Sequence, residues 1–376
     1  MGSSSLGKWN GRWIKDNFPE AYRDLCTSFI DRGFTLSNDQ GYSAMVTMQS
    51  WMFLGSYEKL RDKLLRNHTI SSMAHLGTRA FGAIGGEVVS TTATVFASKK
   101  HDVPGTYLRL VDMQSEEAKR EGALEALANP DCGWFYEARS DDFEAIPGSS
   151  IAYWAGSGAL AHFKNNETLA SHGRFLNGMS TGKNEAVVRC WSEVSLSKTS
   201  FDSESHQAFQ AKNAKFAPYN KGGEFRKWYG NQWDVLAYDE ESNEYMDTLV
   251  GHRHNNPDTY FRQCLSWSKI SSGKLAMRLF PNGFIYDVAG CSLFLDDPSE
   301  ELYVLALFNS SVEMRYLEFL APTLNFEAGQ IRKTPFIRDE SHVDAVASLA
   351  SENINLSKAD WDSFEESWYF SKHPLI

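Results

Sequence analysis

Three short segments in the second half of the chain combine cations, amides and hydroxyls with glycine. Glycine lets a backbone approach a DNA duplex closely, Lys and Arg neutralise phosphates, and Asn and Arg can read the edges of adenine and guanine in the major groove. The sequence therefore predicts contacts with double-stranded DNA. The three segments are Ser180-Thr181-Gly182-Lys183-Asn184 with Arg189, Asn220-Lys221-Gly222-Gly223 with Arg226 and Lys227, and Ser268-Lys269-Ile270-Ser271-Ser272-Gly273-Lys274 with Arg278.

Each segment taken alone is equally typical of a solvent-exposed glycine turn, and it is their occurrence together that favours DNA contact. Thr181-Gly182-Lys183 does not form a nucleotide-hydrolase phosphate loop, because the glycine required five residues before the Gly-Lys pair is absent. Four tryptophans could stack on bases, but in a domain of this size they are more typical of a core. They are Trp191, Trp228, Trp233 and Trp267.

His252-Arg253-His254 places two imidazoles on alternate residues of an extended segment. No nearby cluster of Cys, Asp or Glu completes a ligand set, so we expect no metal site.

The first hundred residues alternate helical and strand patterns. Apolar residues at helical spacing predict a helix over 24–36, an Asn-Asp-Gln-Gly turn leads into a strand over 42–48, and a second helix runs from Ser56 to about Asn67. Two β-type runs, 70–76 and 88–96, then flank a glycine-rich bend. The pattern predicts a strand pair with the aromatic ring of Phe81 at its mouth.

These elements and many longer motifs resemble the adenine-specific DNA methyltransferases, in particular the large type IIG-like PglX enzymes of BREX phage-defence systems. The resemblance covers nearly the whole chain and implies the C-terminal part of a Rossmann-like methyltransferase sheet, followed by a mixed α/β target-recognition domain. It is carried by DLCTSFIDRGF (24–34), GYSAMVTMQSWMFLGSYEKLR (41–61), AFGAIGGEVVSTTA (80–93), PGSSIAYW (147–154), FLNGMSTGKNEAVVRCW (175–191), PYNKGGEFRKWYGN (218–231), LSWSKISSG (265–273), FIYDVAGCSLF (284–294), LAPTLNFEAGQIRKTPF (320–336) and DWDSFEESW (360–368).

The resemblance implies methyl transfer from S-adenosylmethionine to adenine N6, and it assigns roles to three residues. Phe81 would stack on the target adenine after that base is flipped out of the duplex, which restores part of the lost stacking energy. Asp24 and Phe29 would line the adenine of the cofactor. Packing within the helix and the bend is the alternative for all three, and the helical stripe predicts burial of Phe29 whether or not a cofactor binds.

The chain departs from these enzymes at its catalytic motifs. No Asn-Pro-Pro-aromatic tetrad occurs, and Gly85-Gly86 lies in a strand-to-strand bend, which is not where a cofactor loop forms. Met1–Ser5 resembles the segment that follows the tetrad, although a tag remnant gives the same residues. We therefore expect a chain that begins after its active-site loop, binds no cofactor alone and is inactive alone. Its expected partners are DNA and either a missing N-terminal methyltransferase half or other BREX proteins.

Composition limits the remaining possibilities. The chain has 376 residues, a net charge of -11 and five scattered Cys without CxxC spacing, which favours a reducing cytoplasm and excludes a disulfide framework. No apolar run approaches the length of a membrane span, so no membrane partner is expected. Because the net charge repels phosphates, any DNA surface must be local. Acidic residues concentrate in 101–150 and after 339.

These shifts in composition predict four parts. They are the C-terminal part of the methyltransferase domain (1–100), an acidic connector (101–149) with a strand over 106–111 and a helix over 115–128, the DNA target-recognition domain (150–338) and a helical tail (339–376). Two alternatives to a methyltransferase portion remain: a stand-alone DNA-binding specificity subunit that docks a separate catalytic chain, and an inert product of gene truncation.

Overall fold

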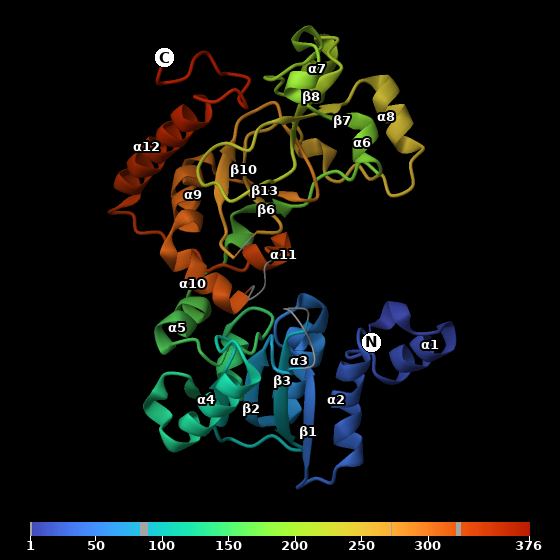
Figure 1. The fold of residues 1–376 in the computed structure, drawn as a ribbon, viewed down its shortest axis with the longest axis vertical. Coiled ribbons are helices and arrows are strands. Elements are labelled where there is room, and N and C mark those ends of the chain that lie inside the picture. The colour runs from blue at the N-terminus through green and yellow to red at the C-terminus, as the bar shows by residue number, and fades with distance from the viewer. Residues whose placement is uncertain (1, 83–88, 272, 321–324) are drawn as a thin grey trace. The chain divides into compact units, whose positions relative to one another are not determined.

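The computed structural model describes residues 2–82, 89–271, 273–320 and 325–376. They form a mixed α/β protein with three β-sheets (Figure 1). The chain divides into two compact units, Met1–Asn165 and Asn166–Ile376. Each unit has its own sheets and its own core, and each is described separately below.

The first unit contains one five-stranded sheet in the order β1-β3-β2-β4-β5. Strand β3 is antiparallel to both β1 and β2, β4 is parallel to β2, and β5 is antiparallel to β4. The predicted pairing of the two runs that flank the Phe81 bend is confirmed as β2 and β3. The elements are α1 (Lys8–Asn17), α2 (Leu25–Leu36), β1 (Tyr42–Met48), α3 (Glu58–Asn67), β2 (Thr69–Gly77), β3 (Thr91–Ala97), β4 (Gly105–Arg109), α4 (Glu116–Ala128), β5 (Phe135–Ala138) and α5 (Ser157–Asn165).

Local chemistry explains where α2 begins and how closely it packs. The carboxylate of Asp24 caps the helix by accepting from the Cys26 N–H at 2.9 Å. Gly33 lies so close to β1 that a Cβ there would stand 2.2 Å from the Ser43 hydroxyl oxygen. The helix therefore packs directly against the edge strand, and a larger residue at this position would displace the Ser43 side chain.

A buried arginine ties the end of this unit to its core. The Arg61 guanidinium donates to the carbonyl oxygens of Trp51 and Leu54 at 2.9 and 2.8 Å, and to Gly148 O at 2.9 and 2.6 Å. Burial lowers the pKa of Arg61 to about 10, which still leaves it charged at neutral pH. Three carbonyls thus compensate the buried charge, and they fix the 148–154 segment over the sheet.

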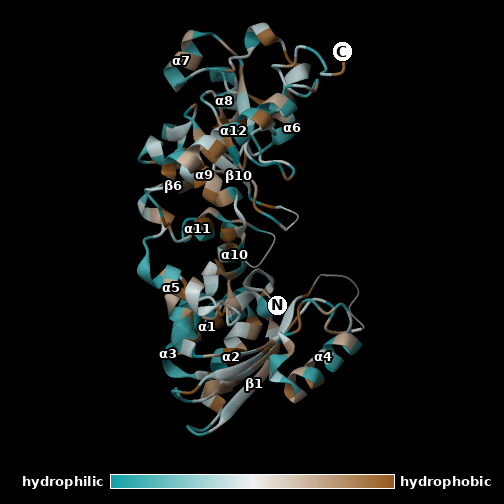
Figure 2. Cartoon of the chain, turned by 90° about the vertical axis from the view of Figure 1, so that its left-hand side faces the viewer, coloured by the Kyte–Doolittle hydropathy of each residue, from teal (hydrophilic) through white to brown (hydrophobic). Residues whose placement is uncertain are grey.

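The segment expected as a connector, 101–149, contributes β4, α4 and β5 to the first unit. The helix itself was predicted correctly and is capped by Ser115, whose hydroxyl oxygen accepts from Ala118 N–H. Hydrophilic and hydrophobic residues alternate along α4 (Figure 2). Lys119 is buried, and its ammonium donates to Leu110 O and Met113 O at 2.8 and 2.6 Å. These bonds hold α4 against the sheet.

One edge and one face of this sheet are open among the described residues. Strand β1 pairs only with β3, so its other edge is unpaired there. A shallow apolar groove of about 450 Å³ crosses β1, β3, β2 and β4. Its lining includes Val46, Val95, Leu108 and the largely exposed Leu127 of α4.

The second unit contains two four-stranded sheets, in the orders β11-β10-β13-β6 and β12-β8-β9-β7. The first is antiparallel throughout, and in the second β12 runs parallel to β8. The elements are β6 (Gly173–Leu176), α6 (Asn184–Val187), β7 (Val188–Cys190), α7 (His206–Ala211), β8 (Phe216–Asn220), β9 (Asp234–Ala237), α8 (Glu240–Asp247), β10 (Cys264–Ser268), β11 (Met277–Phe280), β12 (Ile285–Tyr286), β13 (Gly290–Leu295), α9 (Glu301–Asn309), α10 (Ser311–Leu320), α11 (Ala328–Ile331) and α12 (Val343–Trp361).

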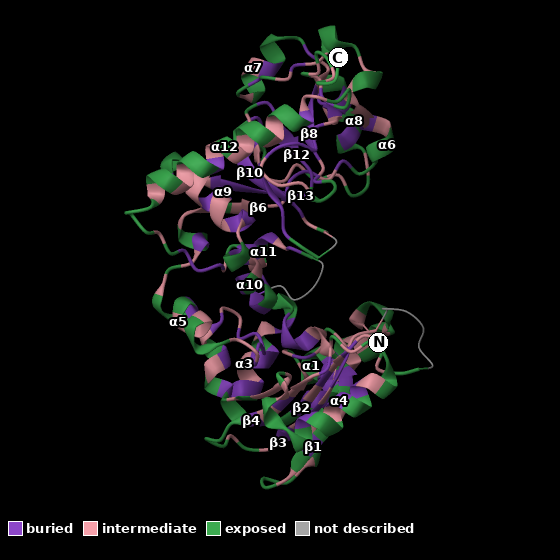
Figure 3. Cartoon of the chain, turned by 60° about the vertical axis from the view of Figure 1, so that its left-hand side comes forward, coloured by how far each residue is buried: buried purple, intermediate pink, exposed green. Residues whose placement is uncertain are grey.

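The core of the second unit includes two apolar clusters. One takes residues from both sheets, such as Leu236 of β9 and Phe280 of β11, and the other packs strands β10, β11 and β13 against α9. Strands β10 and β13 are almost wholly buried, whereas α12, the predicted tail helix, exposes its outer face (Figure 3). Trp267 is fully buried and its indole N–H donates to Phe326 O, as a core tryptophan should; Trp191, Trp228 and Trp233 are half-buried. Among the described residues, no helix has the length and apolar character that a membrane span requires.

The polar centre of the first unit is His75 on β2, which is buried among aromatic rings. Its Nδ1 lies 2.9 Å from the Tyr153 hydroxyl and its Nε2 lies 2.8 Å from the Gln49 side-chain oxygen. Burial, followed by the charges of Arg109 and Lys119, lowers the pKa of His75 to about 3. The folded unit therefore holds a neutral imidazole.

We expect the stability of this unit to fall on acidification because of His75. In the unfolded chain the imidazole is protonated near its ordinary pKa, whereas in the folded state it is protonated only near pH 3. The contribution of neutral His75 to the free energy of unfolding is therefore complete above pH 6.5 and decreases as the pH falls. From pH 7 to pH 5 the loss is about 2 kcal/mol. Urea unfolding of wild type and H75Q at both pH values tests this, and an equal loss in the two proteins would contradict it.

Candidate nucleic-acid interface and base-contact site

Phe81 lies in the bend between β2 and β3, as the sequence predicts. The strand ends at Gly77, which has a φ of 65°, and Arg79 also has a positive φ of 56°, so the backbone turns sharply away from the sheet. The Gly82 N–H donates to the Glu116 carboxylate at 2.9 Å, which anchors the bend to the first turn of α4. The Phe81 ring is 42% exposed. Gly85 and Gly86 lie outside the described residues.

The two residues assigned to cofactor contact have different surroundings. Phe29 is 52% exposed, which corrects the prediction that it is buried, because the apolar stripe of α2 faces a groove at this point. That groove of about 530 Å³ is also lined by Trp9 and Trp13 of α1. Asp24 does not line it, since its carboxylate is engaged in capping α2.

In the second unit the second predicted DNA segment begins at Asn220, whose buried side-chain amide lies at the end of β8. Its side-chain N–H donates to Ser266 Oγ at 2.6 Å, and its side-chain oxygen accepts from Gly222 N–H at 3.0 Å. Its backbone oxygen accepts from Asp287 N–H at 2.9 Å. Gly290 packs on the same residue, where a Cβ would lie 2.5 Å from Asn220 O.

The first segment reaches this centre through the turn at 287–290. Gly178 N–H donates to Asp287 O, and Val288 N–H donates to Met179 O, at 3.3 and 3.1 Å. The turn is itself fixed by Asp287, whose carboxylate accepts from the Tyr219 hydroxyl at 2.7 Å and from Ala289 N–H at 2.8 Å. Residues 180–184 therefore continue directly from a backbone that is bonded to the turn.

The third segment packs on the second. The Ser268 hydroxyl donates to Gly223 O at 2.7 Å, and Lys269 N–H donates to Ala289 O at 2.9 Å. Gly222 has a φ of 81°, and a Cβ there would stand 2.9 Å from Ala289 O, so the close approach requires glycine. The structure thus brings together three segments that are far apart in the sequence.

Arg278 has a structural role that the sequence does not predict. Its guanidinium is fully buried and donates to Arg226 O at 2.9 Å and to Ser268 Oγ at 3.2 Å. It therefore cannot reach a phosphate from this position, which corrects the expectation of a direct DNA contact. The buried charge holds the second and third segments together.

The other predicted cations divide into engaged and exposed groups. Arg226 pairs with Asp360 at 2.9 Å and Lys269 with Glu327 at 3.1 Å, while Lys227 donates to Asn309 O at 2.7 Å. Arg189 donates to backbone oxygens of its own turn, at Glu185 and Val188.

The ammonium groups of three lysines make no ion pair or hydrogen bond within the part of the chain that the structure describes. Lys183 and Lys274 are exposed and Lys221 is half-buried. Asn184 is exposed and accepts from the Thr181 hydroxyl, and Ser271 is bonded to Lys274 O. The local positive charge therefore rests chiefly on the three lysines.

Exposed apolar residues next to these segments were missed by sequence reasoning. Phe225, Ile270 and Val288 are 48%, 69% and 37% exposed. A single apolar residue within a polar loop, such as Ile270 between Lys269 and Ser271, is the signal that identifies them.

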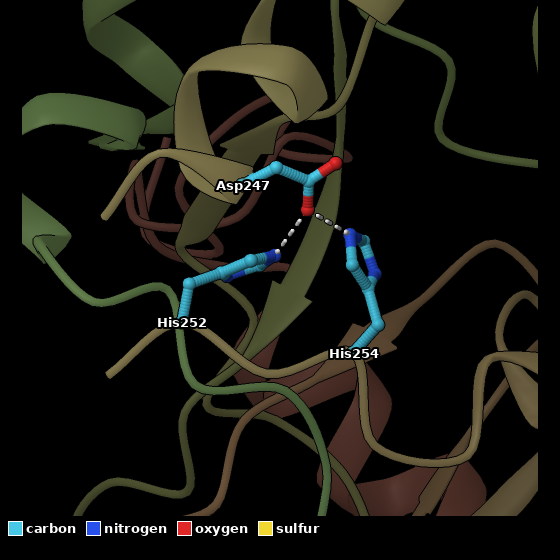
Figure 4. A group of neighbouring side chains, drawn as sticks. All are labelled: Asp247, His252 and His254. Carbon is cyan, nitrogen blue, oxygen red and sulfur yellow. Dashed lines mark ion pairs between the residues drawn. The ribbon is translucent and has the colours of Figure 1, made fainter. Parts of the chain in front are cut away.

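His252 and His254 also lie differently from the sequence expectation, which found no acidic partner for them. Asp247 at the end of α8 places Oδ1 at 3.5 Å from His252 Nε2 and 3.9 Å from His254 Nε2 (Figure 4). Four residues separate Asp247 from His252, and the turn after α8 brings the two side chains together.

The sequence is similar to restriction-modification methylases and to two bacterial adenine-specific methyltransferases. Residues 1–81 match the Eco57I restriction-modification methylase family. The whole chain is 39% identical over 388 residues to the adenine-specific methyltransferase PglX of Lacticaseibacillus casei strain Zhang, of which it covers 32%. It is also 39% identical over 383 residues to the adenine-specific methyltransferase BrxX of Escherichia coli O9:H4 strain HS, of which it covers 30%.

Among solved structures, the chain resembles the type IIL restriction-modification enzyme MmeI, which was determined in complex with DNA. The TM-score is 0.61 at 11% identity, over 98% of this chain and 49% of MmeI. At that identity the likeness concerns the fold. The chain spans about a third of the length of its two methyltransferase relatives. It is therefore PglX/BrxX-like, homologous along its full length to a portion of an adenine-specific methyltransferase.

We expect R278M to destabilise the second unit by about 2 kcal/mol, the usual cost of losing hydrogen bonds made by a buried charged group. K274M, on the neighbouring exposed loop, should leave stability unchanged. Urea unfolding of both variants measures the difference. Equal stability of R278M and wild type would show that the guanidinium does not hold the segments together.

Proposed function

We propose that this chain is the DNA-reading portion of a site-specific DNA adenine-N6 methyltransferase of a BREX-type phage-defence system. The observation that carries the proposal is that Asn220 and the 286–290 turn hold the second and third segments and also residues 178–179, which lead into the first segment. The similarity to PglX and BrxX supplies the reaction class, and the MmeI-like fold supplies a precedent for such a fold in a DNA-bound enzyme.

Lys183, Lys221 and Lys274 would contact phosphates, because each projects from a segment whose backbone is held in place. Asn184, at the exposed start of α6, offers amide groups that can pair with adenine at its major-groove edge. Lys269, Arg226, Lys227 and Arg189 are engaged within the protein, so they would contact DNA only by exchanging a protein partner for a phosphate. Ser271 would add a hydroxyl contact.

Phe81 would stack on the flipped adenine. An exposed ring on a bend anchored by Glu116 is available for a base that has lost its neighbours in the duplex. Phe29 lines the groove between α1 and α2, and Asp24 caps α2. We assign cofactor binding and methyl transfer to the complete enzyme.

The open edge of β1 and the apolar groove across the sheet would receive the remaining part of the methyltransferase domain. An unpaired strand edge and an exposed apolar face are the two features by which a sheet is extended and covered. The same features suit the second candidate function, in which this chain is a specificity subunit and a separate catalytic chain docks there.

DNA affinity of the full chain is expected to depend steeply on salt. Replacing Lys183, Lys221 and Lys274 together by Ala should lower the slope of log affinity against log salt by about 2 to 3, because each phosphate contact contributes about 0.9. Fluorescence anisotropy with a duplex at several salt concentrations measures this. The control replaces Lys198, Lys212 and Lys372, three exposed lysines outside the segments. An affinity that does not change with salt would refute the proposed interface.

The chain alone is expected to transfer no methyl group to duplex DNA, and activity should return when the remaining methyltransferase half is added. In that mixture F81A should lower methyl transfer by at least tenfold while the affinity for DNA stays the same, because the ring contacts only the flipped base. Labelled-methyl incorporation and anisotropy separate the two effects. Incorporation by the chain alone above a no-enzyme blank would contradict the proposal.

A further inference from the structure

Asp247, His252 and His254 form a compact group in the second unit that the proposed DNA function does not use. One ligand atom from each, a carboxylate oxygen and two imidazole nitrogens, lies within 4.8 Å of the others. The carboxylate ends α8, and the imidazoles follow on either side of Arg253 (Figure 4). The two rings lie 4.6 Å apart at 86°, so both can turn a nitrogen toward the same point.

The orientation of His252 leaves a buried nitrogen without a partner. Its Nδ1 lies 2.8 Å from Ser180 O, and because a carbonyl only accepts, this nitrogen carries the proton. The other nitrogen, Nε2, is buried, makes no hydrogen bond with any described group, and faces the Asp247 carboxylate at 3.5 Å. Because a carboxylate oxygen only accepts, this contact is favourable when a cation or a proton lies between the two atoms.

A buried imidazole that donates one N–H to a backbone carbonyl and directs its other nitrogen at a carboxylate is the arrangement found for histidines that bind metals. His254 is half-buried, and its Nε2 lies 3.9 Å from the same oxygen of Asp247. Nitrogen and carboxylate oxygen together are the donor set that zinc accepts.

The group also has access to solvent and a second unpartnered acceptor nearby. Asp247 and His254 line a cavity of about 590 Å³. The side-chain oxygen of Asn243, which lines the same cavity, is buried without a hydrogen bond among the described residues. The wall carries three further carboxylates, which attract cations. They belong to Asp239, Glu240 and Glu244.

We propose that Asp247, His252 and His254 bind a divalent transition-metal ion, for which Zn²⁺ is the best match. Zinc bonds of about 2.0–2.2 Å place neighbouring ligand atoms of a tetrahedral site about 3.4 Å apart. The distances of 3.5 and 3.9 Å from Asp247 Oδ1 to the two histidine nitrogens are close to this value. The two nitrogens lie within 4.8 Å of each other, and a rotation of the His254 ring would shorten that distance. Water from the cavity completes the coordination.

The consequence of binding is local order beside the first DNA segment. Arg253 forms a backbone bridge with Ser180, with N···O distances of 2.9 and 3.1 Å, and His252 is bonded to the same Ser180 carbonyl. An ion held by Asp247 therefore joins the end of α8 to the strand that leads into Thr181–Asn184. This inference concerns metal binding and stands whether or not the chain reads DNA.

The test is titration of Zn²⁺ into the full chain, produced without a histidine tag and stripped with a chelator that is then removed. Calorimetry should give one high-affinity ion per chain, and zinc should raise the melting temperature. D247A and H254A, which leave the His252–Ser180 bond intact, should each weaken binding at least tenfold and abolish the shift. H101A, at an exposed histidine in the first unit, should bind as wild type does.

Equal zinc affinity in D247A, H254A and wild type would overturn the proposal, as would the absence of binding in wild type. The competing account is a proton between His252 and Asp247, which makes the imidazole cationic. Nitrogen NMR of the stripped chain at pH 7 separates the two: a doubly protonated His252 that zinc does not displace would assign the site to an ion pair.

Discussion

The second unit depends on the buried side-chain amide of Asn220. One small group satisfies the Ser266 hydroxyl and the Gly222 N–H, while the backbone oxygen of the same residue fixes Asp287. Leaving any of these buried groups unpaired costs about 1–3 kcal/mol. Because Ser266 belongs to β10 and Asn220 to β8, this amide also joins the two sheets. The loops that follow these strands begin from a backbone that is held by hydrogen bonds. Their exposed residues can therefore contact a ligand without disturbing the core.

The cationic side chains of this unit also divide into those that support the fold and those that face solvent. The chain carries a net charge of -11, so attraction to DNA must come from a few positions. Buried Arg278 supports the backbone, Arg226 and Lys269 pair with acidic residues of the unit, and a small set of lysines faces solvent. An arginine that the sequence places in a polar segment can thus support the backbone instead of contacting a phosphate, and burial and hydrogen bonding distinguish the two roles.

Local chemistry made the elements of the first unit predictable. Strand 42–48 has the predicted limits, α2 begins after its cap Asp24, and α4 begins after its cap Ser115. These features arise from neighbours in the sequence. The parallel pairing of β4 with β2 and the burial of Arg278 involve partners far along the chain, and the exposure of Phe29 depends on how α1 packs. Periodicity and motif composition carry no information on such contacts, so they could not be predicted.

The most direct measurement of the central claim is hydrogen–deuterium exchange of the full chain with and without a DNA duplex. We expect DNA to slow exchange in the backbone amides of 181–184, 221–227 and 269–274 together, and to leave exchange in α12 unchanged. Protection confined to other segments, or protection of one of the three without the others, would contradict the claim that a single DNA-reading surface is assembled around Asn220.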